Sequence, residues 1–203
     1  MKKKTRFSGT KGTIIIIILM GLIISFYYYL SNKPAKTVDD EGVVLSAAQE
    51  ILLKNYDINY PPTPKEVVRE YLQITKVLHN EELTDEEITD VGLKVQQLYD
   101  DEFVANKSED EYIMDLKSEI ANFRTNQYAI ANYYTSASTD VIYDRVNGYD
   151  CAKLYANYSV RTGSKTQMLQ EVFILRKDEA GHWKIFGWQP VIEEEDNEGE
   201  GNE

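Results

Sequence analysis

The sequence is short of the residues from which small proteins build covalent or metal cross-links. It contains one cysteine, Cys151, and two histidines, His79 and His182, among 203 residues. A single cysteine excludes an intrachain disulfide, so packing must hold the fold together. We predict that Cys151 is a buried, inert thiol in a strand, with an intermolecular disulfide as the alternative. Neither histidine has a His or Cys neighbour at ligand spacing, so we expect no metal site and no cofactor.

Sequence motifs of several enzyme classes are also absent. There is no G-x-S-x-G nucleophile elbow and no glycine-rich phosphate loop, so serine hydrolases and nucleotide hydrolases are not supported. The acidic clusters do not match the EF-hand loop, and two of them fall in first turns of predicted helices, where carboxylates complement the helix dipole. The formal net charge of −12 disfavours nucleic acid as a partner. We therefore expect that the protein is not an enzyme.

The longest apolar run is Thr13–Leu30, which contains no charged residue. At a rise of ~1.5 Å per residue such a run covers about 27 Å, close to the hydrocarbon thickness of a bilayer. Five basic residues precede the run and all 34 acidic residues follow it, so the positive-inside rule places the N-terminus in the cytoplasm. We predict a single-pass transmembrane helix over 13–30 in the cell membrane, with an extracytoplasmic C-terminal domain. The alternative is a cleaved signal peptide.

Composition divides the chain into five parts. We predict a basic cytoplasmic stub over 1–12, the transmembrane helix over 13–30, a polar linker over 31–42, one folded domain over 43–191 and a disordered acidic tail over 192–203. The folded domain has the length expected for a single hydrophobic core. The tail has too little apolar surface to fold.

Three helices are predicted in the first half of the domain, and each is preceded by a capping box. The boxes are Thr63–Glu66, Thr84–Glu87 and Ser108–Glu111, in which a hydroxyl and a Glu side chain satisfy free backbone amides. Apolar residues follow each box at helical spacing, which indicates one buried stripe per helix. A shorter helix is predicted over Val43–Tyr56.

After Arg124 the apolar period changes from helical to two. This alternation predicts strands over 127–134, 141–146, 150–160, 166–177 and 182–189. Asn147-Gly148 indicates a tight hairpin between the second and third strands. We therefore predict an α+β fold in which three amphipathic helices pack on a curved antiparallel meander of about five strands.

Three segments of the domain resemble a known family. They are Tyr60–Val68, Leu98–Phe103 and Trp183–Trp188, and they are similar to a family of uncharacterised, singly anchored bacterial proteins with a domain of unknown function. The order of helices and strands also resembles the nuclear transport factor 2-like, or cystatin-like, fold. This resemblance implies a sheet that is backed by helices and wrapped into a cone, often with a pocket at the wide end.

The resemblance to this fold does not choose among its known activities, which include isomerases, dehydratases and assembly components of secretion machines. We expect a non-enzymatic, membrane-anchored extracytoplasmic module that binds an envelope protein or a small apolar ligand, as a component of an envelope assembly. The alternative is a small-molecule isomerase or dehydratase, for which Asp144 and Asp150 lie near a strand turn. An open pocket with a buried carboxylate beside a Tyr hydroxyl would favour that alternative.

Large aromatic side chains are the candidates for lining such a pocket. Their rings fill the core of a curved sheet while a hydroxyl or indole amide stays at its edge. The candidate pocket-lining residues are Tyr71, Tyr99, Tyr155, Phe173, Trp183 and Trp188.

Overall fold

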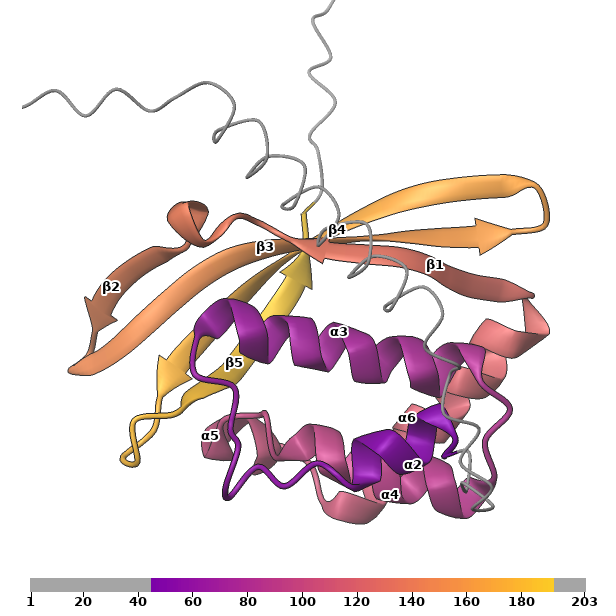
Figure 1. Cartoon of the computed structure of the whole chain (residues 1–203), viewed down its shortest axis with the longest axis horizontal. Coiled ribbons are helices and arrows are strands. Elements are labelled where there is room, and N and C mark those ends of the chain that lie inside the picture. The colour runs from indigo at the N-terminus through magenta and orange to yellow at the C-terminus, as the bar shows by residue number, and fades with distance from the viewer. Residues whose placement is uncertain (1–44, 192–203) are drawn as a thin grey trace, which may run out of the picture. The chain divides into compact units, whose positions relative to one another are not determined.

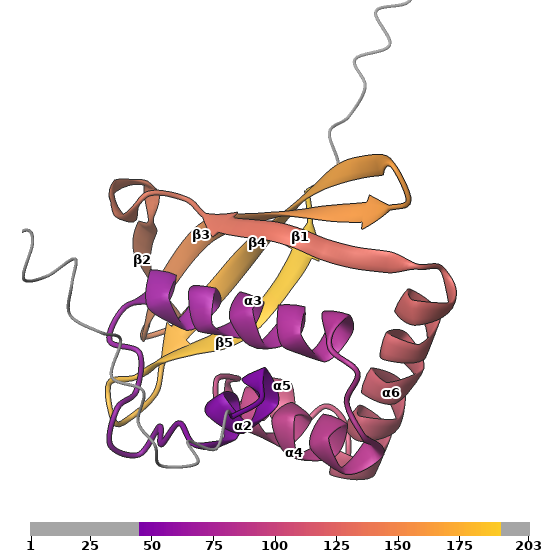
Figure 2. The ribbon, with the colours of Figure 1, turned by 45° about the vertical axis from the view of Figure 1, so that its right-hand side comes forward.

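The computed structural model describes residues 45–191 (Figure 1). The helices in this range are α2 (Ala47–Leu52), α3 (Pro64–Asn80), α4 (Asp85–Gln96), α5 (Asp101–Val104) and α6 (Glu109–Thr125). The strands that follow are β1 (Tyr128–Thr135), β2 (Ile142–Val146), β3 (Tyr149–Thr162), β4 (Lys165–Lys177) and β5 (Trp183–Pro190). A 3-10 turn, η1 (Ser138–Asp140), precedes β2. The helices cover one face of the antiparallel sheet, which makes the class α+β (Figure 2).

The three long helices begin at their predicted caps. At α4, the Thr84 hydroxyl accepts from the Glu87 amide at 3.2 Å and the Glu87 carboxylate accepts from the Thr84 amide at 2.9 Å. The box before α6 is also complete. At α3 the Thr63 hydroxyl caps the helix and a proline occupies its first turn, without the reciprocal backbone bond. The short helix predicted over Val43–Tyr56 is α2, and α5 was not predicted.

The sheet differs from the predicted meander. Its order is β1-β3-β4-β5, and β2 pairs with β3 as well. β1 pairs with the C-terminal half of β3, from Ala156 to Thr162, and β2 with its N-terminal part, from Tyr149 to Lys153. The prediction was wrong at this point because the connection through η1 carries the chain along one edge of β3 and does not reverse it into a hairpin.

The core lies between the helices and the inner face of the sheet. Leu154 of β3, Phe173 of β4 and Ile185 of β5 have no exposed surface. The segment that follows α4 continues the sheet beyond β5, because the Ile185 amide donates to Leu98 O at 2.8 Å and the Asp100 amide donates to Ile185 O at 2.9 Å. This pairing fixes α4 and α5 against the edge of the sheet.

The predicted fold class needs correction in its first element. Within residues 45–191, no helix is both long enough and apolar enough to cross a membrane. The longest described helices, α3 and α6, have 17 residues each and are amphipathic, with acidic residues in their first turns. The run 13–30 lies outside the described residues. The fold that the structure supports over residues 45–191 is the α+β domain with its five-stranded antiparallel sheet.

The prediction of a buried Cys151 is also wrong. Its side chain is only partly buried, and it lies in register between Asp144 of β2 and Arg176 of β4. The neighbouring Ala152 points to the core and is buried. Alternation along β3 therefore places Cys151 on the outer face of the sheet, which the helices do not cover.

Candidate functional site

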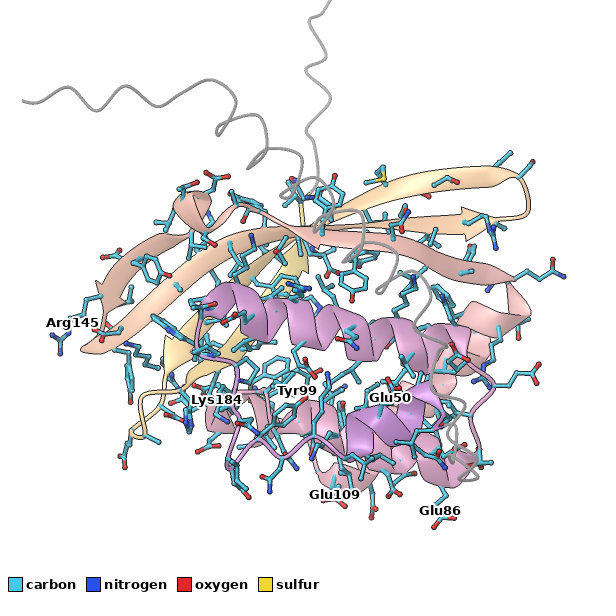
Figure 3. All side chains as sticks on the ribbon, viewed as in Figure 1. Glu50, Glu86, Tyr99, Glu109, Arg145 and Lys184 are labelled. Carbon is cyan, nitrogen blue, oxygen red and sulfur yellow. The ribbon has the colours of Figure 1, made fainter. Side chains whose placement is uncertain are left out.

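The described part of the chain contains a cavity of about 460 Å³ between the helices and the inner face of the sheet. α3, α4, α5 and α6 supply one side of it, and β1, β3, β4 and β5 supply the other. Its aromatic lining residues are Tyr71, Tyr99, Phe103, Tyr112, Phe123, Tyr133, Tyr158 and Trp188. In Figure 3, Tyr99 lies in the interior beneath α3, whereas Glu86 and Glu109 point away from the domain.

Trp188 is the centre of the aromatic wall. Its ring centroid lies 5.2 Å from that of Tyr71, 5.7 Å from Tyr99 and 5.3 Å from Phe103. These separations are typical of favourable aromatic pairs, which lock the rings in position. The cavity therefore has a preformed wall built from α3, the α4–α5 segment and β5.

A carboxylate and a phenol form the polar part of the sheet side. The Tyr158 hydroxyl donates to Glu171 Oε1 at 2.7 Å. Burial raises the pKa of the Glu171 carboxyl above its usual range, although the hydrogen bond from Tyr158 works against this shift. Burial, together with the bond to Glu171, also raises the pKa of Tyr158. Tyr158 therefore stays a neutral donor beside a carboxyl that titrates above the ordinary range of glutamate.

A second polar pair lies on the helix side. His79 Nδ1 is 2.8 Å from Thr75 O, and because a carbonyl only accepts, this nitrogen carries a proton. His79 Nε2 is 3.2 Å from Glu119 Oε1. The hydrogen bond from His79 lowers the pKa of the Glu119 carboxyl. His79 is buried, whereas the Glu119 side chain is 69% exposed, so this pair connects the cavity wall with solvent.

The α5–α6 side of the cavity is open to water. Lys107 and Asp115 line the cavity there and form an ion pair, with about half of each side chain exposed. Burial raises the pKa of Tyr112, which also lines the cavity, to about 12. The cavity therefore runs from a charged, hydrated mouth to an aromatic interior.

Three of the six predicted pocket residues line this cavity, namely Tyr71, Tyr99 and Trp188. Phe173 lies behind the wall, with its ring 6.0 Å from Trp188 and 5.5 Å from Tyr71, and it is fully buried.

The remaining candidates lie elsewhere. Trp183 is buried near Tyr143, with ring centroids 5.7 Å apart. Tyr155 is half-buried beneath Lys153. The carboxylates considered for catalysis, Asp144 and Asp150, are exposed and do not line the cavity.

Sequence reasoning missed Glu171, Tyr158 and Glu119. Glu171 occupies an inward position of β4, two residues before the core residue Phe173 and two after the cavity residue Leu169. A charged side chain at such a position departs from the alternation of apolar and polar residues, and this departure is the signal that could have found it. Tyr158 lies two residues after Ala156, the β3 residue that pairs with Glu171, and is itself in register with Leu169.

The described residues offer little for metal chemistry. Among residues 45–191, no group of three or more His, Cys, Asp or Glu side chains is placed to hold a metal ion. The cavity can exclude water around an apolar group, hold it against aromatic rings and form hydrogen bonds with it at Glu171 and Tyr158.

Comparison with known proteins gives a family without an assigned activity. A family model described as a domain of unknown function (DUF6715) matches residues 1–188. No significant match is found among curated proteins.

Proposed function

We propose that this chain, which belongs to the family of the domain of unknown function DUF6715, is a binding domain whose cavity holds a small, largely apolar ligand. The aromatic cavity of about 460 Å³ carries this proposal. Ligand sites commonly have volumes of about 300–1,000 Å³, apolar walls and a few convergent polar groups. A nuclear transport factor 2-like arrangement, with helices closing one face of a curved sheet, is part of the same proposal.

The solvent-accessible surface of the cavity-lining side chains also supports the proposal that a ligand binds there. Trp188, Tyr71 and Tyr158 are only half-buried, although each points toward the interior and lines the cavity. Apolar surface left accessible in a concave site gains free energy when a ligand removes it from water. A ligand with a large apolar part would therefore bind by burying the apolar surface that the cavity leaves accessible.

A fluorescent neutral probe, N-phenyl-1-naphthylamine, tests the proposal. Its emission rises in apolar surroundings, and saturable enhancement with the full chain is the expected result. Leu169→Trp should fill the cavity and weaken binding about tenfold or more. Met168→Trp is the matched control, because Met168 lies on the same strand, is 54% exposed and does not line the cavity.

Two results would contradict the binding proposal. One is an absence of saturable enhancement in the unsubstituted protein. The other is equal affinity in the Leu169→Trp and Met168→Trp variants, because the probe would then bind outside the cavity.

A small-molecule isomerase or dehydratase is the second candidate. The observation that favours it is the Glu171 carboxyl beside the Tyr158 hydroxyl in an open cavity. A carboxylate with a raised pKa is suited to proton transfer near neutral pH, and a phenol can stabilise a developing oxyanion. Under this candidate Glu171→Gln abolishes turnover of a bound ligand, whereas under simple binding the ligand is recovered unchanged from both proteins.

A further inference from the structure

We propose that the ligand of this cavity carries a positively charged nitrogen, an amine or a quaternary ammonium group, which lies between Glu171 and the aromatic wall. This inference rests on the proposed function and names the chemical class of the ligand. Its basis is the position of an inward-facing carboxylate next to the aromatic wall.

The charges that line the cavity leave Glu171 without a cation. Lys107 pairs with Asp115, and His79 pairs with Glu119. Glu171 accepts a hydrogen bond from the neutral Tyr158 hydroxyl. Across the described residues, no ion pair includes Glu171. Glu171 is partly buried, so its ionised carboxylate loses part of its hydration without gaining a counter-ion, and a cationic ligand group would supply the missing charge.

The aromatic wall lies beside this carboxylate. On the inner face of β4, Glu171 lies two residues before Phe173, whose ring contacts both Tyr71 and Trp188. The negative charge of Glu171 also contributes, after burial, to the raised pKa of Tyr71. The faces of Trp and Tyr rings attract a cation within about 6 Å of the ring centroid, most strongly where water is excluded.

An anionic ligand fits the same lining poorly. Glu119 and Glu171 interact unfavourably with each other, since the charge of Glu119 contributes to the raised pKa of Glu171. A third negative charge in this space would be repelled by both. A neutral ligand would leave Glu171 uncompensated, so the lining favours a cation with an apolar body.

The test compares ligands that differ in charge and little in shape. Benzyltrimethylammonium carries a permanent charge, neopentylbenzene is its uncharged carbon isostere, and phenylmethanesulfonate is an anionic analogue. Each compound is titrated at about pH 7 into the full chain with bound N-phenyl-1-naphthylamine, and its affinity is measured from the displacement of this probe. We expect the cation to bind about tenfold or more tightly than the carbon isostere, and the anion to bind most weakly.

Variants assign the preference to Glu171. Glu171→Gln should reduce the preference for the cation about tenfold, and Glu171→Met serves the same purpose if the Gln variant does not fold. Glu119→Gln should have a smaller effect, because Glu119 already pairs with His79. Glu179→Gln, at an exposed turn residue, is the control and should leave the preference unchanged.

The outcomes separate this inference from the proposed function. Displacement by neopentylbenzene that equals or exceeds displacement by the cation overturns the inference while the binding function stands. A preference for the cation that survives in Glu171→Gln, or that is lost in Glu119→Gln alone, also overturns it. If the fluorescent probe itself does not bind, both proposals fail.

Discussion

Glu171 lies on the inner face of β4, between Leu169 and Phe173. Its carboxyl accepts from Tyr158 at 2.7 Å, yet burial keeps its pKa above the ordinary value of 4.5. This combination costs folding stability when the group is ionised, because desolvation of the charge exceeds the gain from one hydrogen bond.

The pH dependence of stability follows from that raised pKa. A carboxyl whose pKa is higher in the folded state holds a proton there that it loses in the unfolded chain. Its contribution to the free energy of unfolding therefore falls as pH rises from the ordinary value of 4.5 through the raised pKa, and it stays low above that range. Glu171→Gln should lack this decrease.

Urea unfolding at several pH values, from about pH 4 to about pH 8, measures the effect. The stability of Glu171→Gln relative to the unsubstituted protein should increase across the window and then become constant. Glu179→Gln should show no such trend. A difference that shrinks with rising pH would mean that a cation of the protein compensates Glu171.

The aromatic part of the site was easier to predict than its polar part. Tyr71, Tyr99 and Trp188 were expected because large rings in a helix-backed sheet are either core or lining. Trp183 and Tyr155 are also large aromatic residues, but they do not line the cavity. Residue type alone therefore does not distinguish rings that line the cavity from rings that lie outside it. Glu171 was missed because the carboxylates predicted as catalytic candidates, Asp144 and Asp150, lie near a strand turn, whereas the position of Glu171 in the strand alternation carried the information.

At the scale of elements, Arg176 connects three parts of the fold. Its guanidinium donates from Nε to Asp100 at 2.8 Å and from NH1 to Glu102 at 3.0 Å. It also lies over the rings of Tyr149 and Phe186, 4.3 Å and 4.7 Å from their centroids. Asp100 is only 4% exposed and caps α5 through the Glu102 amide. Arg176 thus ties the start of α5 to β4 across β5.

Removing Arg176 should therefore be costly. Arg176→Met leaves the buried Asp100 carboxylate without its partner, and we expect a loss of about 3 kcal/mol in the free energy of unfolding. Asp100→Asn combined with Arg176→Met should recover part of the loss, because no buried charge remains. Arg161→Met, at an exposed position of β3, should change stability by about 0.5 kcal/mol or less. Urea unfolding checks all three, and equal effects at Arg176 and Arg161 would refute this role.

The elements that could be predicted are those specified by residues close together in the sequence. The caps of α3, α4 and α6 involve residues three positions apart, so the sequence alone identifies them. The pairing of both β1 and β2 with β3 depends on contacts between distant residues, such as Tyr128 with Thr162. A period-two pattern gives the strands and their faces but not their neighbours, and the expected meander was wrong for that reason.

For the molecule as a whole, the hydrophobic core of the described residues runs from Ala48 to Ile185. Residues 45–191 contain this core together with the cavity walls. Most of the favourable free energy of folding comes from such burial. This distribution predicts that a fragment of residues 45–191 folds cooperatively without the rest of the chain.

The fragment should unfold in urea within about 1 kcal/mol of the full chain. A shorter fragment that starts at residue 60 is the matched comparison. It lacks α2 and with it Ile51 and Tyr56, which are 1% and 6% exposed, and the bond from the Tyr56 hydroxyl to Glu70 at 2.7 Å. Losing the burial of these two side chains should cost about 3–5 kcal/mol. If both fragments were equally stable, α2 would not belong to the core, and if neither folded, residues outside 45–191 would be required for the fold.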